Sequence, residues 1–335
     1  MKKNIYKYNF KSKIKTNTFS IKQQQLRLEP DFYDQFESCA VPYGVTYTAK
    51  YVEAKNFNPS LHLLLICIKD NSELLTITLN NLQTYDIDSL SNILVIDDRP
   101  SNELNKQIVL DRGYSYISVK NSSNIFNFSM LHNMAVHVVC REYSTISKII
   151  LWNSDLWAKD KNTLPELLRL HDESNSTITG TKLVYPDKTF NYYQESKENT
   201  VQFAGALFGG REDMDGLFPF HIYRGYPPED EKVNCNKGEL FITGAFMIIN
   251  FSWFIKSGGF NPTFAITGQD ADLCLRAISQ NKKVFYFGKD LQLYHYEGIL
   301  RGKEDCNLDQ PKIESEIFGR IWPANIAKKI LFKFE

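Results

Sequence analysis

Short apolar runs alternate with amphipathic segments from Leu61 onward. The run LHLLLICI at 61–68 is apolar apart from His62, as expected for a strand buried on both faces of a sheet. Asn71 or Ser72 can cap a helix directly after it, whose leucines recur on one side. This stretch therefore predicts one strand followed by one helix.

The same pattern recurs along the chain. Further strands are predicted at NILVI, YSYISV, KIILW and within LFITGAFMIIN. Helices are predicted near 101–111, ended by Gly113, around 130–140, and from about Asp270, after a short helix that Gly258-Gly259 ends. Such alternation predicts an α/β fold with a mainly parallel sheet flanked by helices, in which ligands bind beyond the carboxyl ends of the strands.

The two ends of the chain follow a different pattern. Residues 1–60 are rich in Lys, Asn, Gln and Tyr without a strong period, so we expect an N-terminal appendage before a main domain at 61–310. The segment 311–335 mixes apolar residues with Lys328, Lys329 and Lys333. It could pack on the main domain or contact an anionic membrane surface peripherally.

Composition and charge narrow the class of protein. A hydrophobic fraction of 43% and a charged fraction of 23% are those of an ordinary globular protein. Lys plus Arg equals Asp plus Glu at 39 each, so nucleic acid is not the expected main ligand. Any anion must therefore be bound by a local site.

The cysteines and the apolar runs indicate a cytoplasmic protein. The six cysteines include no CxxC pair, which argues against a zinc ribbon or a disulfide-rich scaffold. The basic start is not followed by an apolar stretch, and no run reaches the roughly 18 apolar residues of a membrane span. We therefore expect neither a signal peptide nor a membrane-spanning helix.

Acidic side chains directly follow two of the predicted strands. Asp97-Asp98 come after NILVI, and Asn153-Ser154-Asp155 come after KIILW. Mg²⁺ and Mn²⁺ prefer oxygen ligands and use few protein groups when they also bind phosphate oxygens. An isolated N-x-D triplet is more typical of a turn or a cap, but the position of Asp155 after KIILW favours the metal-binding role.

An ordered set of motifs resembles family 2 glycosyltransferases of the GT-A fold, particularly the bacterial rhamnosyltransferase-like branch. The motifs are VIDD, LWNSD, VQFAGALF, HIYRGYP, FITGAFMIIN, SGGFNPTF, GQDADLCLRA and LYHYEGILRG, and they extend from about Leu61 to Trp322. This resemblance implies a nucleotide-diphosphate sugar donor, and Mn²⁺ or Mg²⁺ as cofactor. It also implies a glycan or lipid-linked acceptor.

The resemblance assigns roles to four residues. It implies that Asp98 hydrogen-bonds the nucleotide base and that Asp155 binds the metal, with Asn153 in place of the first acid of the D-x-D motif. His295 matches a histidine that completes the metal site, although it could also be a core histidine. Asp270 is the implied general base.

Other positions of the expected pocket are less settled. Asp272 is the alternative base, beside Gln269 in the same motif, and an exposed first-turn acid is its plainer interpretation. In place of the family's Thr-Tyr-Asn the chain has Ile68-Lys69-Asp70, where Lys69 could neutralise a phosphate or hold Asp70.

Two further segments could shape the pocket around the substrates. Gly244 and Ala245 would let the backbone approach the acceptor closely. His221 and Arg224 belong to a loop that could close over the donor or the acceptor, or form a plain rigid turn.

These observations predict an inverting, metal-dependent glycosyltransferase that acts in polysaccharide synthesis. One alternative is a non-catalytic sugar-binding or scaffold protein, suggested by Asn153, Gln269 and the change at Lys69. A nucleotidyltransferase is less favoured, because the segment after the first predicted strand, ICIKDNSE, lacks the glycines of a triphosphate loop.

Overall fold

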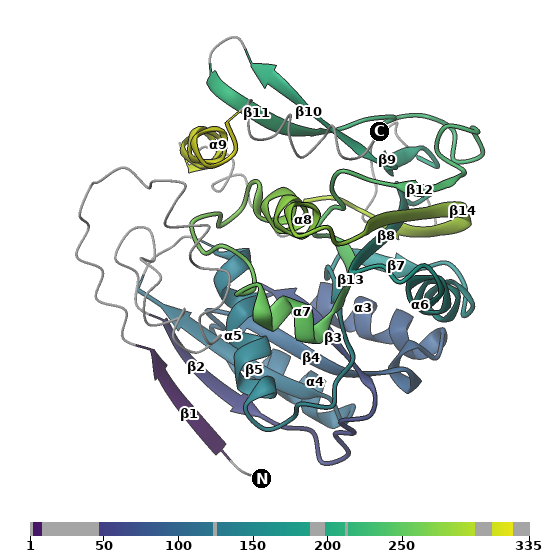
Figure 1. The fold of residues 1–335 in the computed structure, drawn as a ribbon. Coiled ribbons are helices and arrows are strands. Elements are labelled where there is room, and N and C mark those ends of the chain that lie inside the picture. Colours follow the sequence, from purple (N-terminus) through teal and green to yellow (C-terminus); the bar gives the residue numbers. More distant parts are fainter. Residues whose placement is uncertain are drawn as a thin grey trace.

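One large β-sheet with helices on both faces forms the centre of the molecule (Figure 1). The computed structural model describes residues 3–8, 47–122, 126–187, 198–211, 214–298 and 310–323. Across the sheet the strand order is β1-β2-β5-β4-β3-β6-β13-β8-β14-β12, with β7 paired to β14 and β9 to β8. The strands span Lys3–Tyr8 (β1), Tyr47–Val52 (β2), His62–Ile68 (β3), Ser91–Asp98 (β4), Ser115–Asn121 (β5), Lys148–Trp152 (β6), Leu156–Ala158 (β7), Ile178–Val184 (β8), Val201–Phe203 (β9), Asn236–Gly238 (β12), Phe246–Asn250 (β13) and Val284–His295 (β14).

Most strands of this sheet point the same way. β5, β4, β3 and β6 pair in parallel, as do β8 and β14. β13 is antiparallel to both β6 and β8, so β8 has the direction of β6. The expected α/β fold, a mainly parallel sheet flanked by helices, is confirmed.

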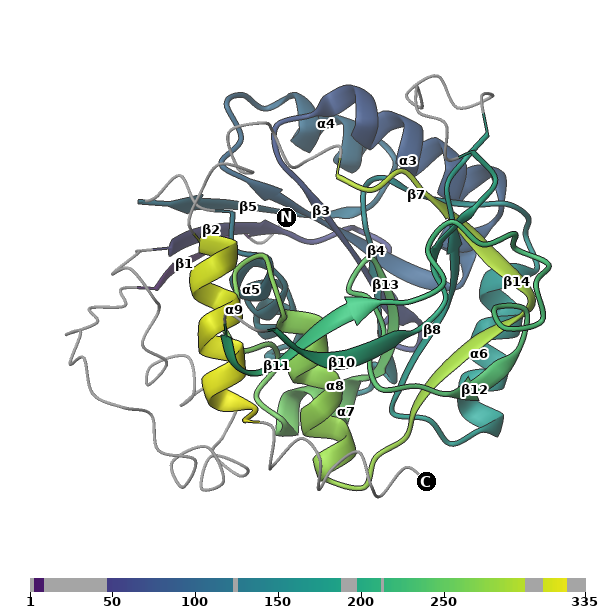
Figure 2. The same cartoon turned by 90° about the horizontal axis from the view of Figure 1, so that it is seen from above.

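Helices α3, α4 and α5 form the connections between the parallel strands β3, β4, β5 and β6. The helices span Ser72–Thr84 (α3), Leu104–Asp111 (α4), Phe128–Cys140 (α5), Thr163–Glu173 (α6), Phe251–Lys256 (α7), Gln269–Ser279 (α8) and Gln310–Ile321 (α9), with a 3-10 turn at Ile87–Ser89. From β3 to β5 the chain moves in one direction across the sheet and then returns to β6. Because such crossovers are right-handed, α3 and α4 cover one face and α5 the other, beside α7 (Figures 1 and 2).

Local sequence explains where these helices begin and what they bury. Asn71 caps α3 by accepting a hydrogen bond from the Leu74 backbone N–H at 3.0 Å. Leu75, Leu79 and Leu82 are fully buried against the sheet, as predicted. Each such side chain contributes about 1.5–3 kcal/mol of burial free energy, so the apolar face fixes the helix on the sheet.

The N-terminal segment contributes to the main sheet. β2 pairs with β5, and its Tyr47, Ala49 and Tyr51 side chains are buried. β1 pairs in turn with β2. Part of the segment expected as an appendage, 1–60, thus extends the central sheet, while residues 9–46 lie outside those described.

A hairpin and the last described helix lie above the sheet. The hairpin consists of β10 (Ala206–Arg211) and β11 (Met214–His221), and α9 packs against β11 (Figure 2). Phe318 and Trp322 are buried, so the part of 311–335 that is described packs on the main domain. Lys328, Lys329 and Lys333, which suggested membrane contact, lie outside the described residues. None of the helices in the described ranges has the length and apolar character that crossing a membrane requires.

Candidate functional site

A pocket of about 650 Å³ opens where several parallel strands end. Its lining includes residues that follow β6 and β14, the loop before β13 and the start of α8. The strand predicted within the apolar segment LFITGAFMIIN runs from Phe246 to Asn250. The first half of this segment is a loop that brings Thr243, Gly244 and Ala245 to the pocket.

Asp155 and His295 meet at one side of this pocket. β7 pairs with the end of β14 so that Leu156 lies opposite His295. His295 Nε2 thereby lies 3.3 Å from Asp155 Oδ1, and both side chains are buried. Asp155 Oδ2 accepts a hydrogen bond from the Gly298 N–H at 3.1 Å. The pair predicted as metal ligands is thus brought together by strand pairing.

The surroundings favour a charged Asp155. Burial alone would raise the pKa of the Asp155 carboxyl, but contact with a protonated His295 ring and with the Gly298 N–H outweighs it and lowers the pKa below its ordinary value. An ionised carboxylate beside an imidazole nitrogen is a donor set that suits Mn²⁺ or Mg²⁺ bound also to phosphate oxygens. Within the described ranges no group of three or more His, Cys, Asp or Glu side chains could hold a metal ion by itself. A cation here would therefore need ligands from its substrate or water.

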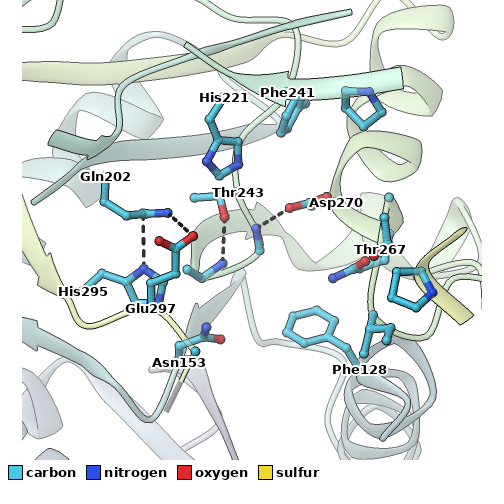
Figure 3. A pocket seen from close by; sticks show the side chains of 18 of the residues that line it. Phe128, Asn153, Gln202, His221, Phe241, Thr243, Thr267, Asp270, His295 and Glu297 are labelled. Carbon is cyan, nitrogen blue, oxygen red and sulfur yellow. Dashed lines mark hydrogen bonds between the residues drawn. The ribbon is translucent and has the colours of Figure 1, made fainter. Parts of the chain in front are cut away.

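A hydrogen-bonded chain extends from His295 to Arg224. His295 Nδ1 lies 3.2 Å from Gln202 Oε1, and Gln202 Nε2 donates to Glu297 at 3.2 Å (Figure 3). Arg224 donates a hydrogen bond to each Glu297 carboxylate oxygen, at 2.6 and 2.9 Å, and the Tyr185 hydroxyl donates to the same carboxylate. Burial alone would raise the pKa of Glu297, but the bonds from Arg224 and Tyr185 lower it to about 2.

Gln202, Glu297 and Tyr185 were missed by the sequence reasoning. Gln202 lies in VQFAGALF and Glu297 in LYHYEG, both segments that carried the family resemblance. Their proximity depends on β9 pairing with β8 and on the turn after β14, where Glu297 has φ 57° and Gly298 φ 95°. Motif membership was the available signal, but the spacing along the chain gave none.

His221 and Arg224, for which the sequence leaves a closing loop and a plain rigid turn open, both line the pocket. The Nη2 atom of Arg224 lies 3.2 Å from Nδ1 of His221. Desolvation, with the Arg224 charge, lowers the pKa of His221 to about 4, so the ring is neutral near neutral pH. This loop is therefore tied to the Asp155 side through Glu297.

Asp270 lines the pocket at the first turn of α8. Its Oδ2 accepts from the Gly244 N–H at 2.9 Å and its Oδ1 from the Ala271 N–H at 2.8 Å. The side chain remains partly exposed. These two bonds fix the direction of the carboxylate toward the pocket.

Asp272, the alternative base, has a different environment. Its side chain is buried and outside the pocket lining. Oδ2 accepts from Arg276 at 2.9 Å and Oδ1 accepts from the Trp322 indole N–H at 3.0 Å. The expectation of an exposed first-turn acid is wrong, because the last described residues of the chain cover Asp272 and bind it.

The residues expected to bind the nucleotide lie apart from the pocket lining. Asp98 is fully buried, with bonds from Arg99 at 2.7 and 2.9 Å and from Asn121 at 3.1 Å. Asp70 accepts from the Ser101 N–H at 3.2 Å, and Lys69 is partly exposed. Cys67 at the end of β3 does line the pocket and lies close enough to Asp98 and Asp97 to be affected by their charges. Burial, and then these two charges, raise the pKa of the Cys67 thiol.

The other predicted pocket residues lie together. Asn153, Gly244, Ala245 and Gln269 all line the pocket. The Asn153 N–H donates to the Ala245 carbonyl at 3.0 Å, which joins the turn after β6 to the loop before β13. Gln269 is buried, and its Oε1 has no hydrogen-bond partner among the described residues.

Another part of the lining is apolar. It consists of Phe126, Phe128, Phe218, Pro219, Phe220, Ile266 and Pro311. These residues come from α5 and the segment just before it, β11, α9 and the loop before α8, and the Phe220 side chain is 43% exposed. The pocket thus presents an apolar surface as well as the polar network around Asp155.

Comparisons with known proteins give limited similarity. A stretch of 182 residues, 52% of the chain, is 26% identical to the O-antigen biosynthesis protein RfbC of Myxococcus xanthus, and the chain spans 12% of the length of that relative. No protein-family profile matches the chain. The crystal structure of GalNAc-T7 with UDP, GalNAc and Mn²⁺ aligns with 70% of this chain and 43% of its own, with a TM-score of 0.49 and 12% identity.

Proposed function

We propose that this protein is a GT-A glycosyltransferase, of the family 2 type, that transfers a sugar from a nucleotide-diphosphate donor to an acceptor hydroxyl with inversion. The observation that carries the proposal is one pocket lined by Asp155, His295 and Asp270 at the carboxyl edge of a mainly parallel sheet. The partial similarity to a protein named for O-antigen biosynthesis supports a role in surface polysaccharide synthesis.

Asp155 and His295 would hold Mn²⁺ or Mg²⁺. They fit such an ion because a carboxylate oxygen and an imidazole nitrogen face each other at 3.3 Å, and His295 Nε2 has no hydrogen-bond partner among the described residues. When bound, the cation would neutralise the charge of the departing diphosphate. Arg224 lies at the same side of the pocket, where its charge is paired with that of Glu297.

Asp270 would act as the general base. Its carboxylate would take the proton of the acceptor hydroxyl as that oxygen forms a bond to the anomeric carbon and the bond to the diphosphate breaks. A single displacement from the opposite face inverts the anomeric centre. The bonds from Gly244 and Ala271 would hold the carboxylate in place during this step.

The acceptor would lie along the apolar part of the lining. Sugar rings and lipid-linked glycans both present apolar faces, which Phe220 and Phe218 could cover. Asp98 would contact the nucleotide base only if Arg99 or Asn121 released it, since both bind its carboxylate. Lys69 and Asp70 would lie beyond Cys67, at the nucleotide side.

The test is a panel of nucleotide-diphosphate sugars, with thermal unfolding in the presence of Mn²⁺ as the first readout. A donor at about 100 times its Kd stabilises the protein by about 2.7 kcal/mol. Transfer to an acceptor should then require the cation, and Asp155→Ala should lose donor affinity and turnover. Asp111→Ala, at an exposed position of α4, is the control.

Three outcomes would decide against parts of the proposal. Binding of donors without any transfer would favour a sugar-binding scaffold. Full activity after chelation would exclude the metal role. No stabilisation by any donor would refute the function itself.

A further inference from the structure

The chain Arg224–Glu297–Gln202–His295 has a fixed hydrogen-bond direction. A guanidinium can only donate, and Arg224 contacts both Glu297 oxygens. The Glu297 carboxylate in this ion pair can only accept, so the nearby Gln202 must present its NH₂ group to it, at 3.2 Å. The amide oxygen of Gln202 is thereby turned toward His295.

This direction determines which ring nitrogen of His295 carries the proton. An amide oxygen can only accept, and it lies 3.2 Å from His295 Nδ1. Nδ1 must therefore be the protonated nitrogen. In the neutral ring Nε2 then carries a lone pair, and this nitrogen faces Asp155 Oδ1 at 3.3 Å.

We propose that Gln202 is a positioning residue that fixes His295 in the Nδ1–H tautomer and so directs the Nε2 lone pair at a divalent cation shared with Asp155. The inference rests on the proposed function for the cation but not for the tautomer. Gln202 is itself buried in β9, which pairs with β8, so its amide keeps one orientation and does not exchange partners with water. A histidine ligand is usually oriented in this way by the partner of its other nitrogen.

The alternative tautomer shows why an orienting group is needed. With the proton on Nε2, His295 would donate to Asp155, and the two side chains would satisfy each other without a cation. With the proton on Nδ1, two electron-rich atoms face each other in a buried space. That arrangement is unfavourable alone and becomes a pair of ligands when a cation binds.

The first measurement is the tautomer of His295 in the metal-free protein. Long-range proton–nitrogen NMR of ¹⁵N-labelled protein at alkaline pH distinguishes the two ring nitrogens. The His295→Asn spectrum assigns the signal. We expect Nδ1–H in the wild type and Nε2–H in Gln202→Met, because Asp155 then becomes the best acceptor. Mn²⁺ affinity of Gln202→Met, measured by calorimetry, should fall about 10–100-fold.

Two further variants separate this role from simple packing. Gln269→Met makes the same change at another buried glutamine of the pocket and should keep both the tautomer and the Mn²⁺ affinity. The double variant Gln202→Glu with Glu297→Gln exchanges the two side chains. The carboxylate then placed at position 202 would accept from His295 Nδ1–H, and the amide placed at position 297 would donate to that carboxylate. This double variant should recover the Nδ1–H tautomer and most of the Mn²⁺ affinity.

The outcomes distinguish this inference from the proposed function. A proton on Nε2 in the wild type, or an unchanged tautomer in Gln202→Met, would overturn the inference. If the double variant is folded but does not recover the Nδ1–H tautomer, the inferred direction of the hydrogen bonds from Arg224 to His295 is also wrong. An Nδ1–H wild type that binds no Mn²⁺, even with a nucleoside diphosphate present, would uphold the tautomer but refute the cation site and with it the metal-dependent function.

Discussion

Asp270 and Asp272 lie two residues apart in one helix, and replacing each by Asn should separate catalysis from stability. Asp270 is partly exposed in the pocket and is held by two backbone N–H groups. Asp272 is buried beneath Trp322 and paired with Arg276. We therefore expect Asp270→Asn to lower turnover and Asp272→Asn to lower the free energy of unfolding.

The contacts give the expected magnitudes. Breaking a buried ion pair costs about 3–5 kcal/mol, and the 19% exposure of Arg276 with the remaining amide oxygen of Asn reduces this to about 2–4 kcal/mol. That corresponds to a fall in Tm of roughly 3–6 °C for a protein of this size. Asp270→Asn leaves one backbone N–H without its acceptor, at a cost of about 1 kcal/mol. Loss of general-base assistance should lower turnover about 10²–10⁴-fold.

Both variants need the same three measurements. Thermal and urea unfolding report stability, titration with the nucleotide-sugar donor reports binding, and turnover is expressed per folded molecule. Donor affinity should change little in Asp270→Asn, because the candidate ligands Asp155 and His295 are intact. If Asp272→Asn is stable but inactive while Asp270→Asn is active, the assignment of the base is refuted.

Three further predictions concern buried groups. Glu314 is fully buried and accepts three hydrogen bonds from the backbone N–H groups of residues 265–267. Glu314→Gln should therefore lower the free energy of unfolding, measured in urea, by about 2–3 kcal/mol. It should also raise KM, because residues 266 and 267 line the pocket. A Cβ at Gly180 would lie 2.1 Å from Ile242, so Gly180→Ala should cost about 1–3 kcal/mol, and adding Ile242→Ala should recover part of it if the clash is the cause. Burial lowers the pKa of His132 to about 4, so the stability it contributes, complete above about 6.5, should be lost as pH falls toward 4; an equally steep pH dependence in His132→Phe would contradict this.

Periodicity was sufficient to predict the centre of the fold. The strands β3 to β6 and the helices between them are continuous in sequence, and each has a clear apolar pattern with a cap such as Asn71. β2 could not be predicted in the same way. Its side chains Tyr47, Ala49 and Tyr51 are buried only because β5, more than sixty residues later, pairs with it.

The candidate site was predictable only where a motif marked it. Asp155, Asp270 and His295 lie in motifs at strand or helix ends, and the structure places all three in one pocket. The environment of Asp272 depends on Trp322, which is fifty residues away in sequence. No local pattern encodes such a contact, and the same holds for the bond between Gln202 and His295.

The position of β13 has a consequence for synthesis of the chain. β13 lies between β6 and β8, and its Asn250 pairs opposite Lys148, about a hundred residues earlier. A nascent chain that has emerged only as far as β8 therefore exposes two unpaired strand edges in the middle of its future sheet. Such edges bind other strands readily, so a ribosome pausing before Phe246 would leave an aggregation-prone intermediate. The loop that precedes β13 also lines the pocket, so the proposed sugar transfer would require that this late strand is already inserted.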